Sequence, residues 1–173
     1  MLKRTLVAGL LAFSFLPSAY ANNFNYNYFE VRTAVSPETT GLELSTYLTD
    51  NSHLLARVDS GFNGYYDLAA GIGFNGPVTD FADVFGQFIF HGIRYSDEED
   101  NKDDETKKEM NIGVRLWLTN QIEAEVLAGT NDDNSVFRAG ARFHSTDQLT
   151  IAAQARNDGT LGPQIVMSVR FQF

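Results

Sequence analysis

The chain has 173 residues, with 22 acidic and 13 basic side chains and a formal net charge of −9. This acidic balance argues against nucleic acid, and against anionic lipid bound through charge, as partners. The chain has no cysteine, which excludes disulfides, thiolate metal ligands, cysteine nucleophiles and an acylated N-terminal cysteine.

Residues 1–21 have the pattern of a cleaved secretory signal peptide. Lys3 and Arg4 supply a positive start, residues 5–16 form an apolar run, and Ala19-Tyr20-Ala21 fits the small-x-small cleavage site. The apolar run is shorter than the roughly 20 residues that span a bilayer, so a membrane anchor is the less favoured alternative. We therefore expect export, cleavage after Ala21, and one domain formed by residues 22–173.

The rest of the chain shows no long helical period. It contains segments in which apolar and polar residues alternate, separated by Asn, Asp, Gly, Thr and Pro. Ten strands are the preferred count, and eight remain possible if the hairpin at Asn63-Gly64 or the first hairpin is misassigned. The predicted strands are 25–35, 41–49, 54–62, 65–74, 82–95, 109–118, 121–130, 136–145, 148–157 and 164–173.

The connections between these segments alternate in character. Those at 50–53, 75–80, 119–120 and 145–148 are mostly short, and the other set includes a long acidic loop over 96–109. Short periplasmic turns and longer outer loops are typical of an outer-membrane barrel. Strands of roughly nine to eleven residues also fit a tilted bilayer crossing. The predicted fold class is all-β, an antiparallel up-and-down transmembrane β-barrel with both termini on the periplasmic side.

Charged residues concentrate on one face of the predicted strands. The cations on this face are all arginine, whose planar fork pairs with carboxylates in confined networks. They balance the acids, as expected of a narrow lumen where unpaired charge is costly. The alternatives are a solvated sheet surface and a water-soluble barrel with an apolar interior. The predicted lumen network is Glu30, Arg32, Glu43, Arg57, Asp59, Asp67, Asp83, Arg115, Glu123, Glu125, Arg138, Arg142, Arg156 and Arg170.

The opposite strand faces carry Leu, Ile, Val, Ala and Phe, and most of them have no charge. A charge facing lipid costs about 2–4 kcal/mol at the membrane midplane, so such faces are predicted to contact lipid. Aromatic residues near the strand ends are predicted to form interfacial girdles. They are Phe62, Tyr66, Phe74, Phe81, Tyr95, Phe137, Phe143, Phe171 and Phe173.

The sequence finishes in "PQIVMSVRFQF", another alternating segment with an aromatic last residue. Together with the signal peptide and the Thr-Asp turns, it resembles the small outer-membrane β-barrels of Gram-negative bacteria, the OmpA-like and OmpX-like group. The resemblance covers residues 22–173 and implies a location in the outer membrane, with no C-terminal cell-wall domain. It also implies a C-terminal signal for the barrel assembly machinery, formed by Ile165, Met167, Val169, Phe171 and Phe173.

Candidate catalytic and metal-binding groups are few. The three histidines are His53, expected in an exposed turn, His91, expected in the polar lumen, and His144. Adjacent His144 and Ser145 would point to opposite strand faces, so they form no dyad. The acidic loop "SDEEDNKDDETKKE" lacks the spacing of a calcium loop and is expected to be solvated, with a weak divalent-ion role as the alternative. We expect no catalytic, cofactor or metal site.

The lumen of a barrel of about eight strands is just wide enough for side chains to fill. We therefore expect a mostly filled lumen, although Gly71, Gly73, Gly113 and Gly140 allow a narrow path as the alternative. The favoured function is a structural or surface-interaction role in the outer membrane. A narrow porin-like channel is the second hypothesis and a lipid-modifying enzyme the third. The expected partners are membrane lipid, lipopolysaccharide and the assembly machinery, and a monomer is expected.

Overall fold

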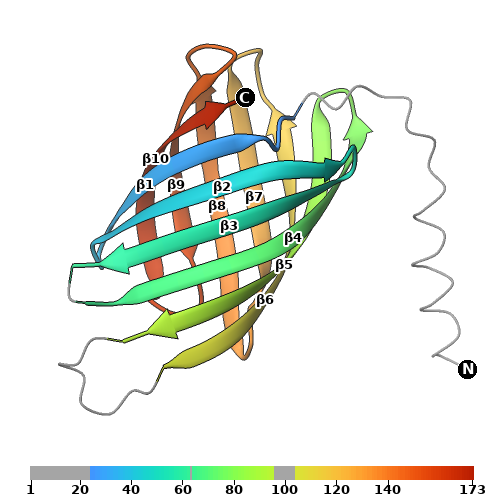
Figure 1. Ribbon diagram of the computed structural model, residues 1–173. Helices are drawn as coiled ribbons and strands as arrows, with labels where there is room; N and C mark the ends of the chain where they lie inside the picture. Colours follow the sequence, from blue (N-terminus) through green and yellow to red (C-terminus); the bar gives the residue numbers. More distant parts are fainter. Residues whose placement is uncertain (1–23, 63, 96–103) are drawn as a thin grey trace, which may run out of the picture.

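A computed structural model describes residues 24–62, 64–95 and 104–173 of the chain (Figure 1). The predicted signal peptide and most of the acidic loop lie outside the described residues. The described part forms ten strands: β1 (Tyr28–Val35), β2 (Thr39–Thr49), β3 (Ser52–Gly61), β4 (Tyr66–Thr79), β5 (Ala82–Arg94), β6 (Glu105–Trp117), β7 (Ile122–Asn131), β8 (Asn134–His144), β9 (Leu149–Asn157) and β10 (Pro163–Gln172).

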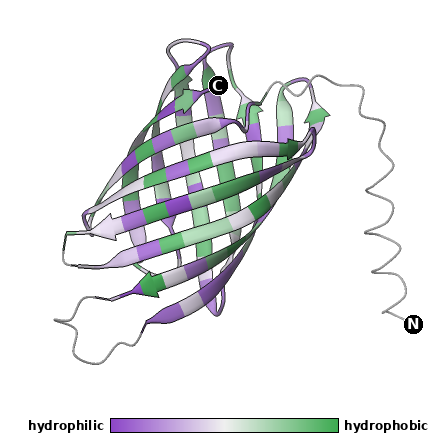
Figure 2. Cartoon of the chain, viewed as in Figure 1, coloured by the Kyte–Doolittle hydropathy of each residue, from purple (hydrophilic) through white to green (hydrophobic). Residues whose placement is uncertain are grey.

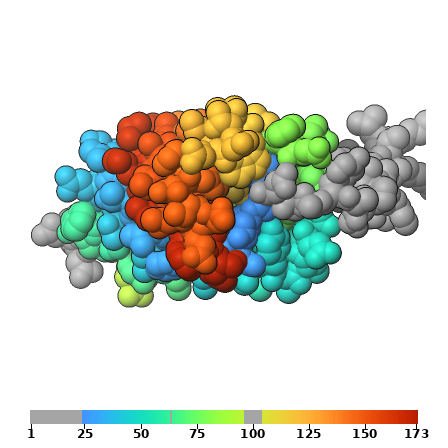
Figure 3. Space-filling model, turned by 90° about the horizontal axis from the view of Figure 1, so that it is seen from above, coloured from blue at the N-terminus to red at the C-terminus, as the bar shows by residue number. Residues whose placement is uncertain are grey.

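The strands form one closed antiparallel barrel in which each strand pairs with its neighbours in sequence. The last strand completes the circle by pairing with the first, from Tyr28↔Gln172 to Val35↔Ile165. In the space-filling view the red C-terminal strand accordingly lies beside the blue start of the chain (Figure 3). The predicted all-β fold and the count of ten strands are confirmed, and the alternative of eight is wrong.

Burial alternates along each strand, and the buried face is the polar one. In β10 the outward residues Ile165 and Met167 are 58% and 57% exposed, whereas Arg170 on the inward face is 3% exposed. On β6, Ile112 is 63% exposed and Arg115 only 2%. Figure 2 shows the resulting alternation of apolar and polar bands along the strands. The barrel therefore has an apolar exterior and a charged interior, the reverse of a water-soluble barrel.

The two ends of the barrel differ. The terminal end carries Asn27 and Phe173, whose backbone groups are hydrogen-bonded at 3.2 Å, together with the connections 50–51, 80–81, 118–121 and 145–148. The loop end carries the connections 36–38, 62–65, 95–104, 132–133 and 158–162. The asymmetry in loop length rests on one connection, 95–104, because the others at the loop end contain at most five residues.

Most strand ends differ from the sequence-based prediction by one or two residues, and β1 begins at Tyr28 and not at residue 25. Three further differences change where particular residues lie. β4 continues to Thr79 through a predicted turn, because its pairing with β5 extends to Thr79↔Ala82. Pro77 is tolerated there next to a register shift, where the ladder is already interrupted. β6 begins at Glu105, inside the predicted acidic loop, since residues 105–109 already pair with β5. β3 begins at Ser52, which moves His53 from an exposed turn into a strand.

Within 24–62, 64–95 and 104–173, no helix has the length and apolar character needed to cross a membrane.

Candidate functional site: the charged lumen

All fourteen residues of the predicted lumen network lie on the inward face of the barrel. Thirteen are at most 6% exposed, and the side chain of Arg138 is 12% exposed. The alternation along each strand places them there, because residues two apart share a face. The lumen is thus lined by ionisable groups at positions where an unpaired charge would be strongly destabilising.

Glu43 on β2 is the centre of one group of contacts. Its carboxylate accepts hydrogen bonds from Arg32 at 2.7 Å, Arg57 at 2.9 Å and the Tyr28 hydroxyl at 2.6 Å. Arg32 also donates two hydrogen bonds, of 3.0 and 2.9 Å, to the two oxygens of Asp59. Residues on β1, β2 and β3 are therefore tied across the inner surface by charge-assisted hydrogen bonds, which are stronger than neutral ones.

A second group lies nearer the terminal end. Arg115 on β6 donates two hydrogen bonds, of 2.7 and 3.0 Å, to Glu123 on β7. Glu30 on β1 accepts from Arg142 at 3.2 Å and from Arg170 across the closing seam. Arg142 thus links β8 to the seam between β1 and β10.

The three histidines are all engaged by polar partners. His91 lies between Asp67 and Glu109, with ring nitrogens 2.9 and 3.1 Å from the two carboxylates. Its predicted place in the polar lumen is confirmed. His144 lies 3.1 Å from a carboxylate oxygen of Glu123. Carboxylates on both ring nitrogens of His91 leave neither nitrogen available to a substrate proton.

His53 corrects the sequence-based expectation of an exposed turn. It is 1% exposed, contacts Asn75 at 3.2 Å and stacks on the Tyr26 ring with centroids 4.5 Å apart. Glu109, 1% exposed, was predicted both as the last residue of the acidic loop and as the first residue of strand 109–118, but was not included in the lumen network, although its even spacing from Arg115 places both on the same strand face. That spacing was the signal that identifies Glu109 as a lumen residue.

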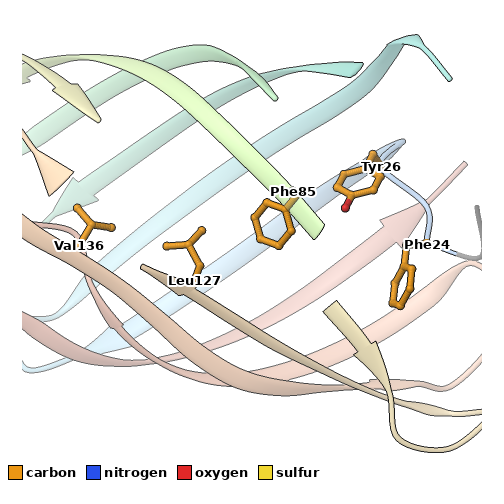
Figure 4. Packing of buried hydrophobic residues seen from close by; sticks show 5 residues of the cluster. All are labelled: Phe24, Tyr26, Phe85, Leu127 and Val136. Carbon is orange, nitrogen blue, oxygen red and sulfur yellow. The ribbon is translucent and has the colours of Figure 1, made fainter. Parts of the chain in front are cut away.

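The segment before β1 enters the terminal mouth of the lumen. Phe24 and Tyr26 are 2% and 3% exposed and belong to an apolar cluster that runs along the lumen (Figure 4). The Arg115 guanidinium lies 5.0 Å from the Phe24 ring centroid and 4.8 Å from that of Tyr26. The Tyr26 hydroxyl donates to Asp83 at 2.7 Å. The predicted strand 25–35 included Tyr26, whereas β1 begins at Tyr28, and the alternation of burial continues back to Phe24. The sequence analysis did not predict that these two rings fill the mouth of the lumen.

The narrow path along the inward glycines was the alternative to a filled lumen, and the space at each of these glycines is occupied by neighbouring atoms. In the register, His53 lies opposite Gly73 and Phe85 lies opposite Gly113. A Cβ atom at either glycine would clash with the ring of that partner. At Gly71 and Gly140 a Cβ atom would instead meet the backbone of the neighbouring strand first, the carbonyl oxygens of Phe88 and Ala153. Gly73 and Gly113 thus admit larger side chains into the lumen, whereas Gly71 and Gly140 allow close approach of the backbone.

Two small cavities lie among the lumen side chains, each of about 10 Å³. Such a volume holds about one water-sized sphere. One is lined by residues that include Arg57, Arg138 and Arg156, and the other by residues that include Arg115, Arg138 and Arg170. In the described part of the chain, no cluster of three or more His, Asp or Glu side chains is arranged to hold a metal ion.

No family model and no curated protein matches the chain. Among solved structures, the KdgM porin is 7% identical with a TM-score of 0.54, covering 84% of this chain and 99% of its own. The KdgM porin in complex with disordered oligogalacturonate gives a TM-score of 0.53 over the same shares, also at 7% identity. The NanC porin is 7% identical and gives a TM-score of 0.48, covering 84% of this chain and 98% of its own. The chain therefore shares the closed antiparallel β-barrel fold of the KdgM porin.

Proposed function

We propose that the protein is an integral outer-membrane barrel with a closed lumen and a structural or surface-interaction role. The observation that carries this proposal is the reversed exposure pattern, with apolar residues such as Val126, 57% exposed, outside and charges inside. A closed sheet leaves no unpaired edge, so all its backbone groups can be satisfied within lipid. Its proposed surroundings are membrane lipid and lipopolysaccharide, and the proposed state is a monomer.

The lumen contacts support a role without catalysis. Each histidine ring is held by polar side chains, and two of the acids near them, Glu109 and Glu123, are also paired with arginines. A catalytic site needs a nucleophile or base that a substrate can reach. The two cavities, each with room for about one water-sized sphere, leave little space for a substrate. We therefore propose that the protein is not an enzyme.

Heat-modifiable migration on a detergent gel tests the membrane proposal. A closed barrel should stay folded in the unboiled sample and migrate differently from the boiled one. Fractionation should place the protein in the detergent-soluble outer-membrane fraction. Equal migration of both samples, together with solubility in the absence of detergent, would instead identify a secreted soluble barrel.

A narrow channel is the second candidate function. It is favoured by the fold likeness to the KdgM porin, one structure of which is a complex with disordered oligogalacturonate. The filled lumen argues for the closed state. Recordings in planar bilayers separate the two candidates, since a closed barrel gives no steady ionic current. A stable current from the purified protein would favour the channel.

We further propose that the outward residues of β10 form the assembly signal of an OmpA-like or OmpX-like barrel. Phe173 is 57% exposed, and its backbone is bonded to Asn27 outside the lumen. Deleting Phe173 should slow insertion in cells several-fold while leaving the urea midpoint of refolded protein nearly unchanged. Phe81→Ala, at an equally exposed site of the terminal end, is the control. Normal insertion of the Phe173 deletion would refute the signal.

A further inference from the structure

Two inward arginines face each other across β8 and β9 in the half of the lumen nearer the loop end. Arg138 and Arg156 are direct partners in the register. The side chain of Arg138 is 12% exposed and that of Arg156 is 4% exposed. Directly opposed residues on one face of a sheet have Cβ atoms about 4.5–5.5 Å apart, and like charges there repel. Such a pair needs negative charge close to both guanidinium groups.

The neighbouring carboxylates supply that charge incompletely. Arg138 donates one hydrogen bond, of 3.2 Å, to Glu125. Arg156 approaches Asp59 at 3.5 Å and Asp158 at 3.4 Å. Asp59 already accepts two shorter hydrogen bonds from another arginine, of 3.0 and 2.9 Å. Arg138 and Arg156 therefore have separate acidic partners at 3.2 Å or more, and one of these acids, Asp59, is held more tightly by Arg32.

Each arginine of the pair also keeps a buried donor without an acceptor. Within the part of the chain that the structure describes, the Nε atoms of Arg138 and Arg156 have no hydrogen-bond partner. A buried donor left unbonded is costly. Both residues line the same cavity of about 10 Å³, whose other charged lining residues are Arg57, Glu109 and Asp158, so arginines outnumber carboxylates there by three to two. A cavity of this size holds about one sphere of the size of a water molecule.

We propose that this cavity is a binding site for a halide-sized monovalent anion, held between Arg138 and Arg156. An anion would accept hydrogen bonds from both free Nε donors and would also reduce the repulsion between the two guanidinium groups. A water molecule would satisfy the donors but not the charges. The volume excludes sulfate or a larger oxyanion. This site follows from the lumen contacts alone and does not depend on the proposed role in the membrane.

Bromide provides a direct probe, because its anomalous scattering locates it in a crystal. Refolded protein comprising residues 22–173, crystallised with sodium bromide, should give an anomalous peak between the guanidinium groups of Arg138 and Arg156. The peak should disappear in Arg156→Gln. It should persist in Arg142→Gln, because Arg142 is an equally buried arginine with an unpartnered Nε that lines neither cavity.

Arg138→Gln gives a second test if Arg156→Gln does not refold, and it too should abolish the peak. The absence of a peak in the wild-type protein would overturn the proposal and assign the cavity to water. A peak of wild-type height in both Arg138→Gln and Arg156→Gln would identify an adventitious ion only, and would also overturn the proposal.

Discussion

The terminal mouth and the middle of the lumen are closed by different means. At the mouth, Phe24 stacks on Trp117 with ring centroids 5.6 Å apart, and Tyr26 packs between His53 and Phe85. The middle is filled by the charge-assisted hydrogen bonds around Glu43. Aromatic rings close the mouth by their volume, whereas the middle is closed because opposite charges hold long side chains across it.

The difference teaches that one barrel can contain two seals with different weaknesses. Where bulky side chains fill the lumen, the packing is lost when atoms are removed and a cavity forms. Where ion pairs fill the lumen, the arrangement is destabilised when one partner is removed, because the other charge stays buried without a partner. Either seal should be sufficient to block conduction while the other is damaged.

Replacing Phe24 and Tyr26 together by alanine should have the largest effect. Each truncation of a buried aromatic costs about 3 kcal/mol or more, so the free energy of unfolding should fall by about 6 kcal/mol. Urea unfolding of the refolded barrel measures this loss, with Phe62→Ala, at a residue of the β3–β4 connection that is 80% exposed, as the control. Planar-bilayer recordings should still show no steady current, because the ion pairs around Glu43 remain. A steady current would place the seal at the mouth alone.

Glu43→Ala should have the next largest effect, since it leaves Arg32 and Arg57 without their shared carboxylate. Removing one partner of a buried ion pair costs about 3–5 kcal/mol, and the same urea experiment measures the change. Glu38→Ala, at an exposed position of the β1–β2 connection, should change stability by less than about 0.5 kcal/mol. A loss below about 1 kcal/mol for Glu43→Ala would show that neighbouring acids replace Glu43 and that the network is redundant.

The middle of the lumen was predictable from the sequence, and the mouth was not. Arg32, Glu43 and Arg57 lie on strands, where a period of two decides which side chains point inward. All ten strands and the fourteen charged inward residues follow from that one rule. The rule also applies to Glu109, the first residue of the predicted strand 109–118, which lies inside β6 because that strand begins at Glu105.

The segment that contains Phe24 and Tyr26 lies before β1, although the predicted strand 25–35 included Tyr26, and the alternation that buries Tyr28 continues back through it. What the period of two does not indicate is that these rings fill the mouth of the lumen. The position of the segment depends on contacts that are distant in sequence, such as the 3.3 Å hydrogen bond from Arg115 to the Asn25 carbonyl. His53 was assigned to a turn for a related reason. The hairpin between β2 and β3 is tighter than the polar residues around Asp50 indicate, and Ser52 already belongs to β3.

Tyr26→Phe should have the smallest effect and separates volume from hydrogen bonding at the mouth. The variant keeps the ring but removes the hydroxyl that donates to Asp83 at 2.7 Å. Because Asp83 is fully buried, loss of this donor should lower the free energy of unfolding by about 1–2 kcal/mol. Tyr66→Phe, at a half-exposed outward position, is the matched control and should be nearly neutral.

If the ring volume closes the mouth, Tyr26→Phe combined with Glu43→Ala should remain non-conducting, whereas Tyr26→Ala combined with Glu43→Ala should conduct. Steady currents of equal size from both combinations would mean that the hydroxyl, and not the ring, holds the mouth closed.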